Sequence, residues 1–356
     1  MAPVGDTPQL RWRLADDDGG QGALFEQEVE CHVGRGEFRG MEFLHVQARR
    51  VINEVPKASH MPFRWTINAY RGCSHACRYC FARPTHEYLG MNSGDDFDRR
   101  IVVKVNAVER VRAELAPGRW AGEHIAMGTN TDPYQRCEGK YRLTQGIIGA
   151  LAVAANPFSV LTKSTLILRD LDLLADAARR TDVRANFSIG TLDEEAWRLT
   201  EPGTPHPLRR VEAVAKLNDA GVPCGVLVAP VLPGISDRPE QLEAVVRACV
   251  EAGARSISPI LLHLRPGVRE HYLSWLSEAR PDLVEHYRAA YPRSYAPAGT
   301  QDRLSETVRQ LVERHGGRAA RASQSRDVPP KPRRSAAPDA RQLAFPLTGE
   351  WDGAMG

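Results

Sequence analysis

Residues 71–81 read RGCSHACRYCF and place Cys73, Cys77 and Cys80 within eight positions. The stretch follows a predicted strand at 63–70 and precedes a predicted helix. Thiolates are soft ligands that select zinc, copper(I) or iron–sulfur clusters. Because three of seven cysteines are bunched here, the pattern favours a metal site over a disulfide framework.

Two kinds of metal centre fit this spacing. A structural zinc site takes four ligands, and His75 or His86 is the candidate fourth. A cubane iron–sulfur cluster normally also takes four thiolates, so three alone leave one iron open to bind a substrate. A second cluster is not expected, because none of the remaining cysteines forms a C-x-x-C pair: Cys31, Cys137, Cys224 and Cys249.

Composition bounds the class of protein. The chain has 356 residues, of which 42% are hydrophobic, enough for a large core. The net charge of +3 permits a nucleic-acid partner without demanding one. No apolar run approaches the roughly 20 residues of a membrane helix. The start MAPVGDTPQL has no secretory pattern. We therefore expect a cytoplasmic protein with no membrane partner.

The chain divides into three predicted parts. Residues 1–62 form an N-terminal extension of short β stretches, and 63–315 alternate strand and helix patterns before closing in helices. Residues 316–356 are rich in Arg, Pro and Ser, which predicts a disordered basic tail.

Alternation within 63–315 predicts an α/β fold with a parallel sheet. About six units suggest either a partial barrel or a doubly wound sheet. The predicted strands are 63–70, 100–105, 124–129, 158–163, 183–190, 223–231 and 255–262. The predicted helices are 144–155, 169–180, 207–221, 239–253, 271–291 and 300–316.

The stretch CSHACRYC, 73–80, resembles the C-x3-C-x-aromatic-C signature of the radical S-adenosylmethionine (radical SAM) superfamily. The resemblance implies a [4Fe-4S] cluster on Cys73, Cys77 and Cys80, whose open iron binds the amino and carboxylate groups of SAM. An electron from a flavodoxin or ferredoxin-type donor then cleaves SAM to methionine and a 5′-deoxyadenosyl radical.

More of the chain, over roughly 60–290, resembles the spore-photoproduct-lyase-like branch of that superfamily. The matching strings are CFARPTHEY at 80–88, GTNTDPYQ at 128–135, VLTKSTLILRDLDLL at 160–174, FSIGTLDEE at 187–195 and VLVAPVLPGISD at 226–237. The implied fold is a partial (β/α)6 TIM-type barrel, with SAM across the carboxyl ends of its strands.

The resemblance also implies roles for single residues. Tyr79 packs beside the cluster, and polar groups at strand ends contact SAM. Apolar groups line the adenine pocket. The implied cofactor contacts are Tyr79, Thr129, Asn130, Thr131, Asp132, Lys163, Ser188, Val228 and Pro230. The alternatives are that Tyr79 is a core aromatic and that 129–132 form an Asn/Asp-Pro turn. Lys163 would then be a solvated lysine and Ser188 a strand-face serine.

Residues that follow strand ends are candidates for substrate contact. They are His263, Arg265, Tyr134 and Arg136. Spore photoproduct lyase carries a hydrogen-donor cysteine at the end of its second strand, and 126–132 contains none here. Cys137 is the candidate substitute, with a small buried hydrophobe as the alternative.

Three functions follow from these patterns. The first is a radical SAM enzyme acting on DNA lesions. The second is radical SAM modification of RNA, protein or a small metabolite, and the third is a non-catalytic zinc or iron–sulfur module that binds nucleic acid. The tail segment QLAFPL, Gln342 to Leu347, resembles a peptide that docks on the DNA sliding clamp. Its alternative is a terminal segment that folds back on the domain.

Overall fold

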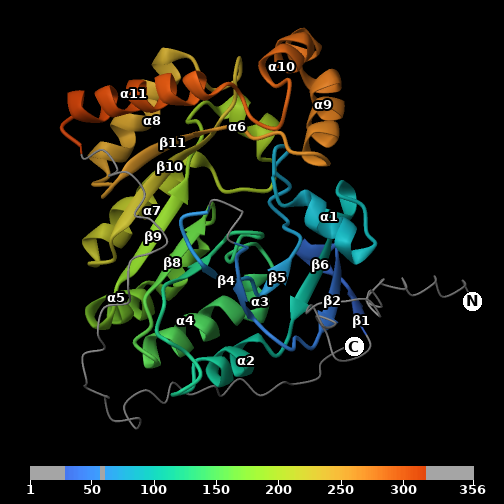
Figure 1. Ribbon diagram of the computed structural model, residues 1–356, viewed down its shortest axis with the longest axis vertical. Coiled ribbons are helices and arrows are strands. Elements are labelled where there is room, and N and C mark those ends of the chain that lie inside the picture. The colour runs from blue at the N-terminus through green and yellow to red at the C-terminus, as the bar shows by residue number, and fades with distance from the viewer. Residues whose placement is uncertain (1–28, 57–60, 318–356) are drawn as a thin grey trace, which may run out of the picture.

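A seven-stranded sheet forms the centre of the computed structural model, which describes residues 29–56 and 61–317 (Figure 1). Its order is β11-β10-β9-β8-β7-β4-β3. Six neighbours run parallel, namely β4 (Trp65–Ile67), β7 (Ile125–Met127), β8 (Phe158–Thr162), β9 (Val183–Ser188), β10 (Cys224–Val231) and β11 (Ile257–Leu261). Strand β3 (Ile52–Glu54) pairs antiparallel with β4. No pairing of β11 with β3 closes this sheet within the described residues. The partial (β/α)6 fold is thus confirmed.

Helices connect and cover the parallel strands. They are α2 (Ala107–Glu114), α3 (Glu138–Tyr141), α4 (Leu143–Val153), α5 (Leu171–Arg180), α6 (Glu194–Thr200), α7 (Pro207–Asp219) and α8 (Pro239–Glu251), with the 3-10 turn η4 (Thr165–Asp170). Helix α4 buries Ile147, Ile148 and Leu151, as its predicted apolar face requires. Gly221 and Gly253 follow α7 and α8 with φ of +80° and +73°, the left-handed conformation that ends helices.

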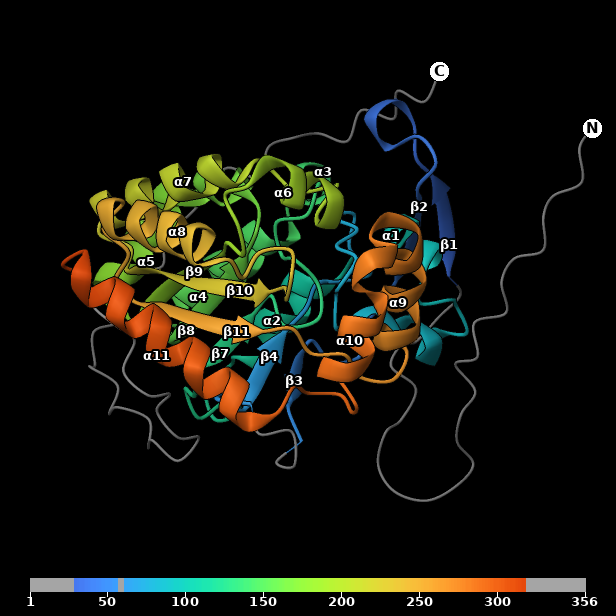
Figure 2. The same cartoon turned by 90° about the horizontal axis from the view of Figure 1, so that it is seen from above.

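A second, four-stranded sheet has the order β1-β2-β6-β5. It contains β1 (Glu30–Val33), β2 (Glu42–Val46), β5 (Tyr70–Arg71) and β6 (Arg100–Lys104), beside the short helices η1 (Gly36–Phe38), η3 (Arg83–Leu89) and α1 (Asp95–Arg99). The predicted strand 100–105 is therefore β6 and belongs to this sheet, parallel to β2, and the predicted strand 63–70 is split between β4 and β5. In both views the β1–β2 hairpin lies at the opposite side of the molecule from α5 and α11 (Figures 1 and 2).

The C-terminal helices are α9 (Val268–Ala279), η5 (Pro281–Leu283), α10 (Val284–Ala290) and α11 (Ala298–Arg314). Helices α9 and α10 enclose a separate apolar cluster around Tyr272, Tyr287 and Tyr291. Helix α11 packs against β11 and α8, away from that cluster (Figure 2).

Hydrogen bonds cross the predicted boundary at residue 62, because β3 pairs with β4 and β2 with β6. The division into 1–62, 63–315 and 316–356 stays a prediction. The clamp-like segment 342–347 lies outside the described residues. In the part of the chain that the structure describes, no helix is both long and apolar enough to span a membrane.

Candidate functional site

The cysteine loop lies between β5 and η3, after the first parallel strand. Cys73 and Cys77 are buried and Cys80 is partly buried, and none forms a disulfide. Burial raises the pKa of the Cys73 thiol, and the charges of Asp132, Cys77 and Cys80 raise it further. The loop begins at Gly72, whose φ is +80° and where a Cβ would approach the Phe97 carbonyl oxygen to 2.8 Å. A larger residue at this position would displace the loop.

The segment after β7 holds this loop in place. The Thr131 hydroxyl donates to the Gly72 carbonyl at 2.6 Å, and Gln135 Nε2 donates to the same oxygen at 3.0 Å. The Ser74 amide donates to Gln135 Oε1 at 3.1 Å. Gln135 is fully buried. The sequence alone did not single it out, because a glutamine after a strand carries no motif.

Asp132 ties the cysteine loop to the ends of β7 and β8. Its carboxylate accepts from the Thr162 hydroxyl at 2.6 Å and from the Lys163 and Tyr134 amides at 2.7 and 2.9 Å. His75 Nδ1 lies 3.3 Å from Asp132 Oδ2. Burial alone would raise the pKa of Asp132, but His75 and these donors outweigh it and lower the pKa to about 2. The carboxylate is thus ionised and surrounded by donors from this chain.

Lys163 extends from the end of β8 toward the cysteines. Its Nζ lies 5.6 Å from the Tyr79 ring centroid. Burial raises the pKa of the Cys77 thiol to about 12, and the Lys163 charge opposes that rise. The same charge acts on Cys80 and on Glu201. The ammonium group therefore lies against the cysteine loop, at Tyr79.

A buried ion pair between Glu201 and Arg210 holds the Tyr79 side chain in place. The Tyr79 hydroxyl donates to Glu201, and Arg210 Nη2 lies 2.5 Å from Glu201 Oε2. Burial opposes ionisation of Glu201, but Arg210 and Lys163 lower the pKa of the carboxyl. Arg210 also donates to the Ser188 carbonyl at 3.1 Å, so β9 is joined to the cysteine loop. Neither Glu201 nor Arg210 was predicted from the sequence, since an arginine within an amphipathic helix resembles a solvated one.

The donor set fits an iron–sulfur cluster better than one zinc ion. Two thiolates on one zinc lie at most about 4.6 Å apart, because each Zn–S bond is about 2.3 Å. Among the described residues, the only three metal-ligand side chains whose atoms all lie within 4.8 Å of one another are Glu30, His32 and His45. The three thiols are spread more widely, as ligands on separate irons are.

The two candidate fourth zinc ligands are engaged elsewhere. His75 pairs with Asp132, and His86 Nε2 is hydrogen-bonded to the Arg100 carbonyl at 3.0 Å. The His86 ring also packs edge-on against Phe97, with centroids 5.2 Å apart. Neither imidazole completes a compact group with the thiols, which weighs against the zinc alternative.

The other predicted cofactor contacts lie at the carboxyl ends of the strands. Thr129 accepts from Asn68 Nδ2 at 3.2 Å, and Asn130 is exposed with its amide bonded to Asn68 Oδ1 at 3.1 Å. The Ser188 hydroxyl donates to the Ala229 carbonyl at 2.6 Å. Val228 is fully buried within β10, and Pro230 is partly buried near its end. Their SAM contacts stay predictions.

The four residues predicted to contact substrate are brought together only in part, since Tyr134 and Arg136 have separate partners. Tyr134 is fully buried and its hydroxyl donates to Asp170 at 3.1 Å, while Cys137 is fully buried in the main core. Arg136 is exposed and donates to the Glu37 carbonyl at 2.9 Å.

His263 and Arg265 lie together after β11. Arg265 donates to the Tyr295 hydroxyl at 3.0 and 2.7 Å through Nε and Nη2. The His263 ring lies 4.7 Å from the Tyr295 ring. Arg265 and Tyr295 are both exposed, and Tyr295 was not identified from the sequence.

The chain is similar to several known proteins. An uncharacterized protein of Mycobacterium tuberculosis is 45% identical over 300 residues, which cover 84% of this chain and 88% of the relative. An uncharacterized protein of Methanocaldococcus jannaschii is 24% identical over 72% of this chain and 86% of its own length. Among solved structures, spore photoproduct lyase complexed with dinucleoside spore photoproduct superposes with a TM-score of 0.55 and 18% identity. The match covers 77% of this chain and 79% of the lyase, and shows a shared fold.

Residues 67–275 match the Radical SAM superfamily, whose members use a [4Fe-4S] cluster and SAM. The matched segment contains the cysteine loop and all six parallel strands except the first two residues of β4. The chain belongs to the radical SAM superfamily.

Proposed function

We propose that this protein reductively cleaves SAM and acts on lesions in DNA as a lyase-like repair enzyme. The observation that carries the first half is the Lys163 ammonium after β8, which lies 5.6 Å from the ring of Tyr79 in the cysteine loop. A bound cluster and SAM supply a 5′-deoxyadenosyl radical, and the chain positions both and excludes water.

We assign Cys73, Cys77 and Cys80 to the cluster. Lys163 pairs with the SAM carboxylate, a charge-assisted contact. Tyr79 packs beside the cluster, fixed by Glu201. Thr129, Asn130, Thr131 and Asp132 border the SAM amino group, where Asp132 acts mainly by orienting the ends of β7 and β8. Ser188, Val228 and Pro230 border the ribose and adenine.

Two observations support DNA as the substrate: the fold shared with spore photoproduct lyase, and the exposed side chains that follow β11. The lyase with the same fold is complexed with a dinucleoside photoproduct. Here Arg265 and Tyr295 offer a guanidinium and an aromatic ring on one exposed surface, the groups that bind phosphates and stack on bases. His263 lies against the same ring. We propose this surface as the substrate rim.

The hydrogen donor differs from that of spore photoproduct lyase. Cys137 and Tyr134 remain candidates, but both are fully buried. Burial raises the pKa of the Cys137 thiol, so it holds its proton. A Cys137→Ala variant that still releases 5′-deoxyadenosine but fails to complete the product would support its role as donor.

Anaerobic reconstitution with iron and sulfide tests the chemistry. We expect a brown protein that cleaves SAM to methionine and 5′-deoxyadenosine with dithionite, and a Cys77→Ala variant that does neither. Cys249→Ala, at a buried cysteine in helix α8, is the matched control and should retain activity. Absence of SAM cleavage by the intact chain would favour the non-catalytic binding module.

Release of 5′-deoxyadenosine against irradiated DNA, tRNA and cell extract tests the substrate. Stimulation by irradiated DNA, weakened in Arg265→Ala, is the expected result. Stimulation only by undamaged RNA, by protein or by a small metabolite would end the repair proposal. We further propose a cytoplasmic location and a flavodoxin or ferredoxin-type donor, since members of the superfamily generally need such a reductant. Docking of 342–347 on the sliding clamp stays a prediction.

A further inference from the structure

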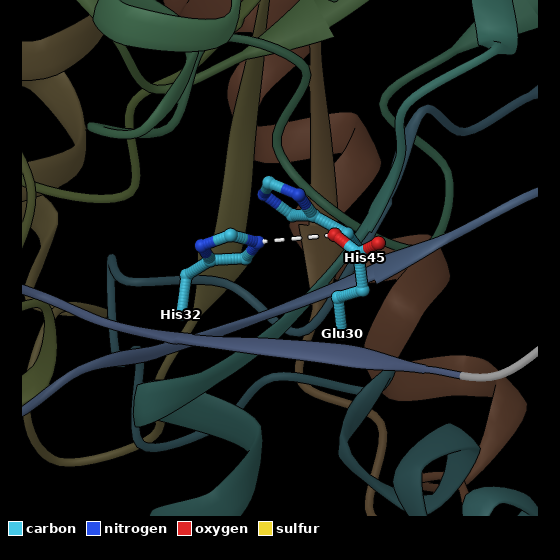
Figure 3. Close-up of side chains that lie close together, drawn as sticks. All are labelled: Glu30, His32 and His45. Atoms are coloured by element: carbon cyan, nitrogen blue, oxygen red, sulfur yellow. Dashed lines mark ion pairs between the residues drawn. The ribbon is translucent and has the colours of Figure 1, made fainter. Parts of the chain in front are cut away.

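Three metal-ligand side chains converge on the β1–β2 hairpin, far along the sequence from the cysteine loop. Glu30 lies directly opposite His45 in the antiparallel register, and His32 is two residues beyond Glu30 on the same strand. Residues two apart on a strand, and residues directly opposite, share one face. Figure 3 shows the two imidazoles and the carboxylate turned toward one another on that face.

The distances are those of a metal-binding group. One ligand atom from each of Glu30, His32 and His45 lies within 4.8 Å of the others. His32 Nε2 is 3.5 Å from Glu30 Oε2, and the two imidazole centroids are 4.0 Å apart. Two imidazoles and a glutamate are the ligands of open-sided zinc sites, which leave a fourth position to water.

A neighbour outside the hairpin orients one of the ligands. His45 Nε2 is hydrogen-bonded to the Tyr141 hydroxyl at 2.7 Å, at the end of α3. A ligating histidine typically has such a partner on its second nitrogen, which fixes the ring and its tautomer. The bond leaves Nδ1 of His45 for a metal.

The three ligand side chains are open to solvent. Glu30 and His32 are exposed, and His45 is half-buried. A divalent cation can therefore reach this face of the hairpin from solvent.

We infer that Glu30, His32 and His45 form a binding site for a divalent transition metal, Zn²⁺, separate from the iron–sulfur cluster. The ion joins edge strand β1 to β2 and, through His45, to Tyr141 of α3. The inference does not depend on the proposed function, because none of these residues lies in the SAM or cluster site.

Zn²⁺ titration of the full chain with its cluster reconstituted tests the site, since the cluster then occupies the three loop thiols. X-ray absorption at the zinc edge should show nitrogen and oxygen ligands at about 2.0–2.1 Å and no sulfur at about 2.3 Å. His32→Gln and Glu30→Gln should each weaken zinc binding by at least on the order of 10- to 100-fold. That is the effect of removing a residue that only supports a ligand, and these variants remove a ligand itself.

Matched variants separate the site from other zinc-binding groups. Cys31→Ser, between two of the ligands in sequence, and His286→Gln, an exposed histidine on α10, should leave zinc binding unchanged. Tyr141→Phe keeps the ring but removes the bond to His45, and should weaken binding without abolishing it. Sulfur in the zinc shell, or equal affinity in His32→Gln, Glu30→Gln and the parent chain, would overturn the inference. Loss of SAM cleavage with zinc binding intact would count against the proposed function alone.

Discussion

The ion pair between Glu201 and Arg210 offers the sharpest test of how the cysteine loop is held. Arg210 is 1% exposed, and its guanidinium contacts four oxygens. They belong to Glu201 at 2.5 Å, Thr204 at 2.5 Å, the Pro205 carbonyl at 2.9 Å and the Ser188 carbonyl at 3.1 Å. Replacing Arg210 with Met removes every one of these donors while keeping an apolar stem.

The expected cost follows from burial. Removing one partner of a buried ion pair costs about 3–5 kcal/mol, because the other charge stays buried and loses its counter-ion. A domain is stable by only about 5–15 kcal/mol, so this loss is a large share of the total. Lys163 remains near Glu201 and offsets part of the cost, which places Arg210→Met toward the lower end of the range.

Urea unfolding of the reconstituted protein, followed by circular dichroism, measures the change in free energy. Arg209→Met is the matched control. Arg209 is the preceding residue on α7, its side chain is 73% exposed, and it pairs with Glu212 at 3.6 Å. An exposed pair of this kind is worth about 0–1 kcal/mol.

A double-mutant cycle completes the test. Glu201→Gln alone should also destabilise by about 3–5 kcal/mol, and Glu201→Gln with Arg210→Met should cost much less than the sum of the two. Additive costs, or a cost for Arg210→Met no greater than for Arg209→Met, would refute the view that a buried ion pair supports the loop.

Three further predictions concern single residues. Lys163→Ala should weaken SAM binding roughly 10- to 100-fold in equilibrium dialysis, because the variant loses one charged hydrogen bond to SAM. The control Lys216→Ala, at an exposed lysine, should leave SAM binding unchanged, and both variants should keep a normal iron content. Gln135→Leu leaves the Ser74 amide without a partner, which should cost about 1–3 kcal/mol and lower the iron retained per chain. Burial lowers the pKa of Lys104 to about 7 from 10.5, so between these pH values the unfolded chain binds the extra proton and stability rises with pH. Lys104→Met should therefore stabilise the protein more at pH 7 than at pH 10, and an equal gain at both would contradict that reasoning.

Much of the fold could be predicted because local patterns and architecture agree. The helical apolar faces and the glycines after α7 and α8 mark the connections between parallel strands. The strand at 100–105 could not be assigned to its sheet. Its valines are buried on both faces, as in a strand of the large parallel sheet. In the structure β6 instead lies between β2 and β5 in the four-stranded sheet.

The candidate site was predictable in position and not in orientation. Sequence order places Asp132, Tyr134 and Lys163 after strand ends, which is where the carboxyl edge of a parallel sheet gathers them. Which way each side chain points depends on partners far along the chain. Tyr134 turns into the core toward Asp170, and Asp132 turns toward His75. Those pairings join segments that no spacing rule connects.

The two metal sites inferred for this chain differ in ligand type, and that difference decides how they would fill. The cysteine loop offers three thiols, two buried and one partly buried, which soft iron–sulfur chemistry prefers, whereas the hairpin offers imidazole and carboxylate on an exposed face. Zinc also binds thiolates well, so an excess of zinc before cluster assembly would compete for Cys73, Cys77 and Cys80. Once the cluster is in place, only the hairpin remains as a compact three-ligand group among the described residues. The order of loading, iron and sulfide first and zinc second, therefore determines whether each metal occupies the site whose chemistry suits it.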